Sequence, residues 1–169
     1  MFMSVKDMKR LMSAAAMSEE EIQDFLSSPR IARLATIQNG KPHIVPVWYF
    51  YDGKNIIIST PKGTKKIKNL QSNPNVSIVI DIVDGKAEDI SYATKAKAVI
   101  IEGVAELRDE DDIDNSFIKK TYERYVGKNG LNNPMVQFSV NLPRYMVVIR
   151  PTRIISWDFT RGQTKVQLD

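Results

Sequence analysis

The pattern of hydrophobic and polar residues along the chain predicts a mainly β protein. Short runs of apolar, β-branched and aromatic residues recur between turn-forming residues. These runs cover residues 31–38, 43–51, 54–60, 76–82, 97–107, 145–150 and 152–158. Asn39-Gly40 and Asp52-Gly53 predict hairpin turns, so the first three runs should form a meander. We therefore expect six or seven strands, mostly antiparallel.

Prolines, glycines and β-branched residues predict further details of these strands. The second strand carries Pro42 and Pro46, which cannot donate to a ladder, so it should leave regular pairing near Pro46. Gly103 interrupts a long run and predicts a bulge or bend. The segment from Val76 to Ile82 is almost continuously apolar, which is typical of a strand buried on both faces.

Helices are expected only at crossings between short strands. They should cover residues 1–17, 18–28, 64–72 and 109–125, and a polar loop should cover 84–94. Residues 1–17 read as an N-terminal helical arm, and Ser18 with Glu21 fits a capping box at the start of the second helix. This arrangement favours a closed or partly closed barrel over a doubly wound sheet. The length predicts a single domain over residues 1–169.

The stretch from Ile56 to Leu70 combines an apolar strand, a hydroxyl-rich turn and the start of a helix. The strand ends in Ser59 and Thr60, and the helix should begin near Thr64. Free backbone N–H groups and the positive end of the helix dipole favour an anion at such a helix start. The two hydroxyls, the amides of the first turn and nearby lysines could together donate to one phosphate group.

Lysines dominate the first turn of this helix. Lys65 and Lys66 lie where the helix dipole disfavours cations by roughly 0.3–1 kcal/mol each, and a bound phosphate would reverse that effect. The alternative is that Lys62, Lys65, Lys66 and Lys68 simply form a solvated face. The spacing is not that of a P-loop, and no aromatic residue is interleaved to stack on nucleic-acid bases.

Composition narrows the chemistry further. The chain has no cysteine, which excludes disulfides and thiol chemistry and fits a reducing, cytoplasmic location. His43 is the single histidine, so neither a metal site nor a Ser-His-Asp triad is expected. No apolar run reaches the roughly 18 residues that predict a membrane span. The net charge of +4 and the pI of about 9.2 favour an anionic partner.

Aromatic residues cluster at the end of the second strand. Strand alternation sends Trp48 and Phe50 to one face and Tyr49 and Tyr51 to the other. Such residues usually belong to the core, and the alternative is a wall for a flat ring. His43 could act as a general base or a haem ligand, although a lone histidine more often has a structural role.

Taken together, these segments resemble the FMN-binding split-barrel family related to pyridoxamine 5′-phosphate oxidase. The matching segments are Arg33 to Thr36, Asn39 to Trp48, Ile57 to Thr60 and Lys65 to Pro74, in the family's order and spacing. The resemblance covers about residues 20–158. It implies an antiparallel split β-barrel with short flanking helices, and a homodimer that holds the flavin at the subunit interface.

The resemblance also implies which residues contact the cofactor. The backbone of residues 44–48 borders the flavin ring, Ser59 and Thr60 contact the cofactor, residues 64–66 hold its phosphate, and Trp157 reaches the partner subunit's flavin. The cofactor-binding residues expected in this way are Ile44, Val45, Pro46, Val47, Trp48, Ser59, Thr60, Thr64, Lys65, Lys66 and Trp157.

Departures from the oxidase argue against pyridoxamine phosphate as the substrate. The oxidase carries Arg-x-His after the tryptophan, whereas residues 163–165 here are Gln-Thr-Lys. The helix from Phe117 to Tyr125 lacks the Tyr, Arg and Ser set with which the oxidase grips its substrate's phosphate. Lys65 replaces an arginine and lacks the bidentate fork, although it can hold a phosphate as a point charge.

We therefore expect a homodimeric, FMN-dependent oxidoreductase that acts on a small molecule other than pyridoxamine phosphate, with catalytic residues unknown. A deazaflavin coenzyme could replace FMN, and haem is a third option weakened by the single histidine. The alternative from another class is a non-enzymatic flavin carrier or sensor, or a basic nucleic-acid module. The lack of a clustered basic helix or stacking motif counts against nucleic acid.

Overall fold

A computed structural model describes residues 5–83, 88, 95–109 and 115–161 of the chain. The helices are α1 (Val5–Ala15), α2 (Glu19–Ser27), α3 (Lys65–Ser72), α5 (Asn115–Gly130) and α6 (Pro134–Val140). The strands are β1 (Ala32–Gln38), β2 (Lys41–Val47), β3 (Phe50–Tyr51), β4 (Ile56–Pro61), β5 (Asn75–Val83), β6 (Ala96–Asp109) and β7 (Arg144–Asp158). Most of the predicted loop over 84–94, the acidic residues 110–114 and the segment 163–165 lie outside the described residues.

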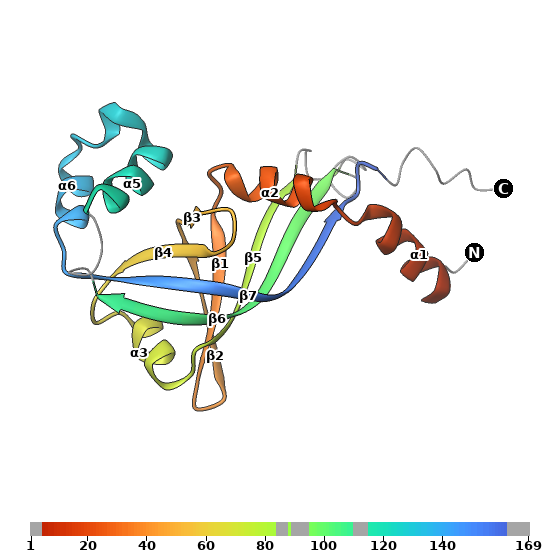
Figure 1. Cartoon of the computed structure of the whole chain (residues 1–169), viewed down its shortest axis with the longest axis horizontal. Coiled ribbons are helices and arrows are strands. Elements are labelled where there is room, and N and C mark those ends of the chain that lie inside the picture. Colours follow the sequence, from red (N-terminus) through yellow and green to blue (C-terminus); the bar gives the residue numbers. More distant parts are fainter. Residues whose placement is uncertain (1–4, 84–87, 89–94, 110–114, 162–169) are drawn as a thin grey trace.

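The strands form one antiparallel sheet in the order β2-β1-β5-β6-β7-β4-β3. The edge strands β2 and β3 do not pair with each other, yet only two residues separate Val47 from Phe50. The chain there spans at most roughly 11 Å, so the two edges must approach each other. Figure 1 shows β1 and β2 crossing β4, β6 and β7 steeply. The sheet is therefore a split barrel, not closed by hydrogen bonds, as the sequence predicts.

A single apolar core fills the inside of the curled sheet. Leu34, Ile58, Ile78, Ile101 and Ile149 come from five different strands, and each is at most 1% exposed. Burying a side chain of this size stabilises the fold by roughly 1.5–3 kcal/mol. Helices α2 and α3 add further apolar side chains to the same core.

Strand β5 buries one face rather than two. Val76, Ile78 and Ile80 are buried, whereas Ser77 and Val79 between them are only half-buried. The expectation of a strand buried on both faces is therefore wrong. A β-branched run has no period of its own, so it cannot reveal whether its second face is covered.

Strand β2 leaves its pairing close to Pro46, as the sequence predicts. Pro46 lies opposite Arg33, and the register with β1 ends one residue later, at Val47 opposite Ala32. Because β2 is an edge strand, a proline can face its unpaired side without breaking the ladder. The break after Val47 divides the expected strand over residues 43–51 into β2 and β3.

Residues 144–158 form one continuous strand rather than the two strands expected. Pro151 lies opposite Gly103, and the register between β6 and β7 shifts between Glu102 and Gly103. This confirms the predicted irregularity at Gly103, which lets β7 continue past its proline. A Cβ at Gly103 would lie 2.6 Å from the Arg150 carbonyl oxygen, so this crossing requires glycine.

The helices α5 and α6 make a second, smaller apolar cluster on the outside of the sheet. Ile118, Tyr122 and Leu131 pack there against Met146 of β7. Trp48 belongs to this cluster whereas Tyr49 lies in the main core, which confirms the predicted division of the aromatic run. The predicted capping box is also confirmed, with Ser18 and Glu21 exchanging both hydrogen bonds. Among the described residues, no helix is long and apolar enough to cross a membrane.

Candidate functional site

The turn between β4 and α3 exposes backbone donors at the start of the helix. Gly63 adopts a φ of +82°, which bends the chain sharply into α3. Thr64 occupies the N-cap position, but its side chain makes no capping hydrogen bond. The amides of Ile67 and Lys68 donate to the Thr64 carbonyl at 3.1 and 3.2 Å. The amides before them lie outside the helix ladder, so they are available to an external acceptor.

Two threonine hydroxyls beside this turn have unused hydrogen-bonding capacity. Thr60 is 2% exposed, and its Oγ1 has no hydrogen-bond partner among the described residues. The buried Oγ1 of Thr64 likewise has no hydrogen-bond partner among the described residues. A buried polar group left without a partner costs about 1–3 kcal/mol. An acceptor or donor supplied by a ligand would remove that cost.

Ser59 and Thr60 do not form a side-by-side hydroxyl pair. Successive residues of a strand point to opposite faces, and β4 alternates between buried and half-buried positions. Thr60 points to the buried side, whereas the Ser59 hydroxyl accepts a hydrogen bond from Arg144 on the other face. The two hydroxyls therefore lie on opposite faces of β4.

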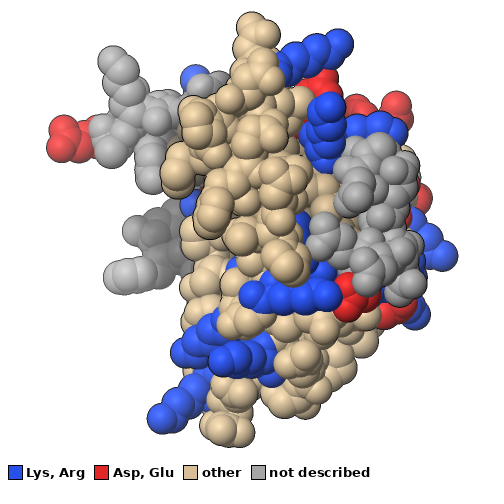
Figure 2. Space-filling view, turned by 90° about the vertical axis from the view of Figure 1, so that its left-hand side faces the viewer, with Lys and Arg blue, Asp and Glu red and all other residues tan. Residues whose placement is uncertain are grey.

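The lysines after the turn differ from one another. Lys65 is exposed, whereas Lys66 is half-buried. Burial lowers the pKa of Lys66 from its ordinary value, and the positive charge of Arg144 lowers it further. Lys62 is engaged elsewhere, since its Nζ lies 2.7 and 2.8 Å from the carboxylate oxygens of Asp109. Among the ion pairs of the described residues, none involves Lys66. Figure 2 shows Lys and Arg side chains gathered on the lower part of one face of the molecule.

Arg144 is a member of this site that the sequence did not indicate. It is 3% exposed, and its Nε donates to the Ser59 Oγ at 2.6 Å while its Nη2 donates to the Ser59 carbonyl at 3.2 Å. It is the first residue of β7, opposite Pro61 at the end of β4. The sequence places it one residue before an expected strand, with no motif around it, so no local pattern could have identified it.

A chain of buried polar side chains connects α3 to β2. Asn69 of α3 is fully buried, and its Nδ2 donates to the Thr36 Oγ1 at 2.9 Å. The Thr36 hydroxyl in turn donates to the His43 carbonyl at 3.4 Å. The helix with the two lysines is thereby fixed to β1 and, through it, to the strand that carries residues 44–48.

The residues of β2 expected near a flavin ring differ in how far they are exposed. Ile44 is 65% exposed and Pro46 is exposed, whereas Val45 is half-buried and Val47 is buried. The side chain of Trp48 stacks on Tyr125 of α5, with ring centroids 4.7 Å apart. Its indole is thus already covered by α5, which leaves the backbone of β2 and its exposed side chains for a ligand.

Trp157 lies far from the β4–α3 turn within one copy of the chain. It is opposite Ala98 at the far end of β7, whereas Ser59 is opposite Met146. Met146 and Trp157 are eleven residue steps apart along β7, which is roughly 36 Å of extended strand. A single copy therefore does not bring Trp157 to the rest of the candidate site.

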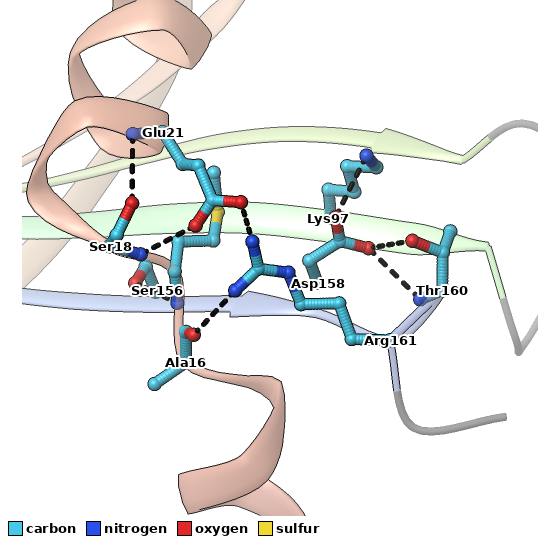
Figure 3. Close-up of polar contacts among 9 residues, drawn as sticks. Ala16, Ser18, Glu21, Lys97, Ser156, Asp158, Thr160 and Arg161 are labelled. Carbon is cyan, nitrogen blue, oxygen red and sulfur yellow. Dashed lines mark hydrogen bonds and ion pairs between the residues drawn. The ribbon is translucent and has the colours of Figure 1, made fainter. Parts of the chain in front are cut away.

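A fully paired polar network holds that far end of β7 (Figure 3). Asp158 forms an ion pair with Lys97 at 2.8 Å and accepts hydrogen bonds from the Thr160 amide and hydroxyl at 2.9 and 2.5 Å. Burial alone would raise the pKa of Asp158, but these contacts lower it below the ordinary value. Arg161 pairs with Glu21 of α2 and donates to the Ala16 carbonyl.

Two surface hollows lie away from the candidate site. One of about 420 Å³ lies between α2, the β3–β4 turn and β7, and one of about 530 Å³ lies between α2 and the strand ends near Asp158. Neither is lined by any of residues 59–66. The described residues also contain no group of three metal-ligating side chains. The β4–α3 turn is therefore the candidate binding site, because its first amides and the Thr60 and Thr64 hydroxyls have no hydrogen-bond partner among the described residues.

Comparison with known proteins identifies relatives over most of the chain. A conserved hypothetical protein from Mycobacterium tuberculosis is 32% identical, with a TM-score of 0.73, and the match covers 93% of this chain and 94% of that one. General stress protein 26 of Bacillus subtilis is 34% identical over 92 residues, which is 54% of this chain and 65% of that protein. The chain thus spans less than two thirds of that curated relative.

More distant structures share the fold. An F420 reductase is 22% identical with a TM-score of 0.59, covering 78% of this chain and 94% of that one. A FAD-binding protein from Mesorhizobium loti is 21% identical with a TM-score of 0.57, covering 83% and 92%.

The family model described as pyridoxamine 5′-phosphate oxidase matches residues 18–158, which include every strand of the sheet. The chain therefore belongs to the pyridoxamine 5′-phosphate oxidase-like family, as a member that is not the oxidase itself.

Proposed function

We propose that this protein is an oxidoreductase that binds a phosphate-bearing flavin, with the phosphate at residues 59–66. FMN is the first candidate for this cofactor. One observation carries the proposal. Lys66 is half-buried with no carboxylate partner among the described residues, and the buried Thr60 and Thr64 hydroxyls of the same β4–α3 segment have no hydrogen-bond partner there either. A phosphate fits this set of donors because it accepts several hydrogen bonds and neutralises cations.

The positions of the residues indicate which part of the cofactor each of them would contact. Lys65 and Lys66 supply charge to the phosphate, and the amides at the start of α3 supply directed donors. The exposed edge of β2, over residues 44–48, borders the ring. When bound, the flavin supplies hydride or electron transfer, whereas the protein binds it, orients it and sets its electrostatic surroundings. Flavin chemistry of this kind requires neither a catalytic triad nor a metal site.

We propose further that the working form is a homodimer. Trp157 is a candidate ring contact, and roughly 36 Å of strand along β7 separates it from Met146, opposite Ser59, in its own copy. A second copy could bring its Trp157 to this site. The exposed Ile44 on the free edge of β2 supports an interface there, since it is 65% exposed.

A deazaflavin coenzyme is the second candidate for the cofactor. It also carries a phosphate, so the donors of the β4–α3 turn suit it equally well. The fold shared with a protein described as an F420 reductase supports this option, and the fold shared with a FAD-binding protein supports a flavin. A flavin carrier or sensor without catalysis would use the same phosphate site.

The proposal is tested by identifying the bound chromophore and its activity. The purified protein should be yellow and release FMN on denaturation, or bind FMN or a deazaflavin on titration of the apoprotein. A colourless protein with no affinity for either would contradict it. Anaerobic reduction of the loaded protein by candidate electron donors then separates an oxidoreductase from a carrier, because a carrier should show no turnover.

A further inference from the structure

Arg144 is a buried cation whose contacts join three parts of the molecule. We propose that it is a positioning residue that fixes the Ser59 hydroxyl as a hydrogen-bond donor to the flavin phosphate and couples this donor to the α5–α6 hairpin. This inference rests on the proposed function, because it deepens the account of the same phosphate site.

The guanidinium donates hydrogen bonds to several groups of this chain. Its Nε and Nη2 donate to Ser59, its Nη1 donates to the Ser139 carbonyl at 2.5 Å, and its Nη2 also donates to the Tyr122 hydroxyl at 3.2 Å. Arg144 therefore uses its planar fork to hold groups in place, in a way that a lysine cannot reproduce.

The contact with Ser59 determines what its hydroxyl can offer. A serine hydroxyl has one O–H donor and two acceptor lone pairs. The Arg144 Nε occupies one lone pair at 2.6 Å, so the O–H points elsewhere and is available as a donor. Accepting a charge-assisted hydrogen bond also polarises the hydroxyl and strengthens its own donation. A phosphate oxygen, which only accepts at neutral pH, suits such a donor.

The same guanidinium fixes both helices of the hairpin. Tyr122 belongs to α5 and Ser139 to α6, and their hydroxyl oxygens lie 2.6 Å apart. The Arg144 guanidinium carbon also lies 5.6 Å from the centre of the Tyr122 ring. A movement of the α5–α6 hairpin would therefore shift Arg144 and, with it, the Ser59 hydroxyl. The hairpin lies outside the β4–α3 turn.

The experiment compares ligands with and without a phosphate. The apoproteins of the wild type, Arg144→Lys, Ser59→Ala and the double variant are titrated with FMN and riboflavin, and with a deazaflavin coenzyme before and after enzymatic removal of its phosphate. Arg144→Lys keeps the positive charge, so a loss of preference for the phosphorylated ligand reports lost positioning. Arg153→Lys is the matched control, because Arg153 lies on the same strand with its side chain 64% exposed.

The expected result is a selective and non-additive loss. Arg144→Lys and Ser59→Ala should each weaken binding of the phosphorylated ligand about tenfold, the value of one charge-assisted hydrogen bond. Binding of riboflavin should stay within about twofold. The double variant should lose about tenfold rather than a hundredfold, because both changes remove the same interaction. Arg153→Lys should match the wild type.

The contrary outcomes are distinguishable. If the wild type prefers neither phosphorylated ligand, the proposed function is wrong and this inference falls with it. If the wild type prefers one and Arg144→Lys keeps that preference, or weakens both ligands equally, the phosphate site stands and the role of Arg144 is overturned. If Arg144→Lys does not fold, Ser59→Ala and Tyr122→Phe decide: an unchanged preference in both overturns the inference, and a selective loss in both supports it.

Discussion

The surroundings of the two ends of strand β7 differ in whether every buried hydroxyl or carboxylate finds a partner among the described residues. At the Asp158 end, the carboxylate accepts two hydrogen bonds and an ion pair, and Arg161 pairs with Glu21. At the Arg144 end, the buried Thr60 and Thr64 hydroxyls have no hydrogen-bond partner among the described residues. The Arg144 end of β7 pairs with both β4 and β6, whereas the Asp158 end pairs with β6 alone.

This difference distinguishes polar groups that stabilise the fold from polar groups that are available to a ligand. A network whose donors and acceptors are all matched stabilises the fold and has nothing left to offer a ligand. Buried groups without partners cost stability and persist where something else satisfies them. The comparison therefore predicts that substitutions at the two ends will change stability with opposite signs.

The largest expected effect is at the paired end. Asp158→Ala should lower the free energy of unfolding by about 2 kcal/mol, because it removes charge-assisted hydrogen bonds to a side chain that is only 10% exposed. Since the pKa of Asp158 is lowered in the folded protein, this contribution should be complete at neutral pH and vanish as pH falls through that lowered pKa. Urea unfolding of both proteins across acidic pH checks this, and a difference independent of pH would contradict it.

The opposite sign is expected at the unpaired end. Thr60→Val should raise the free energy of unfolding of the apoprotein by about 1 kcal/mol, since it removes a buried hydroxyl that has no partner among the described residues, and should weaken FMN binding. Thr36→Val is the matched control, because the equally buried Thr36 hydroxyl bonds to Asn69. It should destabilise the protein by about 1–3 kcal/mol. Destabilisation of similar size in both variants would show that the Thr60 hydroxyl has a structural role.

A smaller effect should appear in the pH dependence of binding. Burial and Arg144 lower the pKa of Lys66 in the free protein, so its charge is lost at a lower pH than that of an ordinary lysine. Affinity for FMN should therefore fall as pH rises through this lowered pKa. Lys66→Arg retains its charge, so its affinity should decline less over the same range. Parallel pH profiles for the two proteins would exclude Lys66 from the phosphate contact.

The smallest effect is expected from the exposed part of the paired end. Arg161→Ala should change the free energy of unfolding by about 1 kcal/mol or less, because its ion pair with Glu21 is partly exposed to solvent. Thermal unfolding at low and high salt measures the contribution. A loss as large as that of Asp158→Ala would mean that Arg161 carries more of the network than its exposure indicates.

Local patterns in the sequence predicted the parts of the fold that depend on neighbours along the chain. The capping box at Ser18, the turns at Gly40 and Gly53 and the irregularity at Gly103 are all present. Each requires a particular residue for a backbone reason within a few positions. The start of α3 after Thr64 was predictable for the same reason.

The remaining features depend on contacts between distant strands. Pro46 can remain paired because β2 lies at an edge, and the sequence does not reveal strand order. Arg144 reaches Ser59 across 85 positions, and no local pattern marks that contact. The unused capacity of the Thr60 hydroxyl likewise appears only once its surroundings are known. The sequence thus indicated the β4–α3 segment as a candidate phosphate site, whereas the contacts of Arg144 and Thr60 required the structure.

The most direct test of a flavin phosphate at the β4–α3 turn is the affinity of the Lys65→Ala, Lys66→Ala double variant for FMN. Lys119→Ala, Lys120→Ala is the matched control, since it removes two adjacent exposed lysines from another helix, α5. Isothermal titration of the apoproteins should show FMN binding weakened about a hundredfold in the first variant, with riboflavin binding little changed and the control like the wild type. Equal FMN affinity in both double variants would contradict the assignment of the phosphate to this turn.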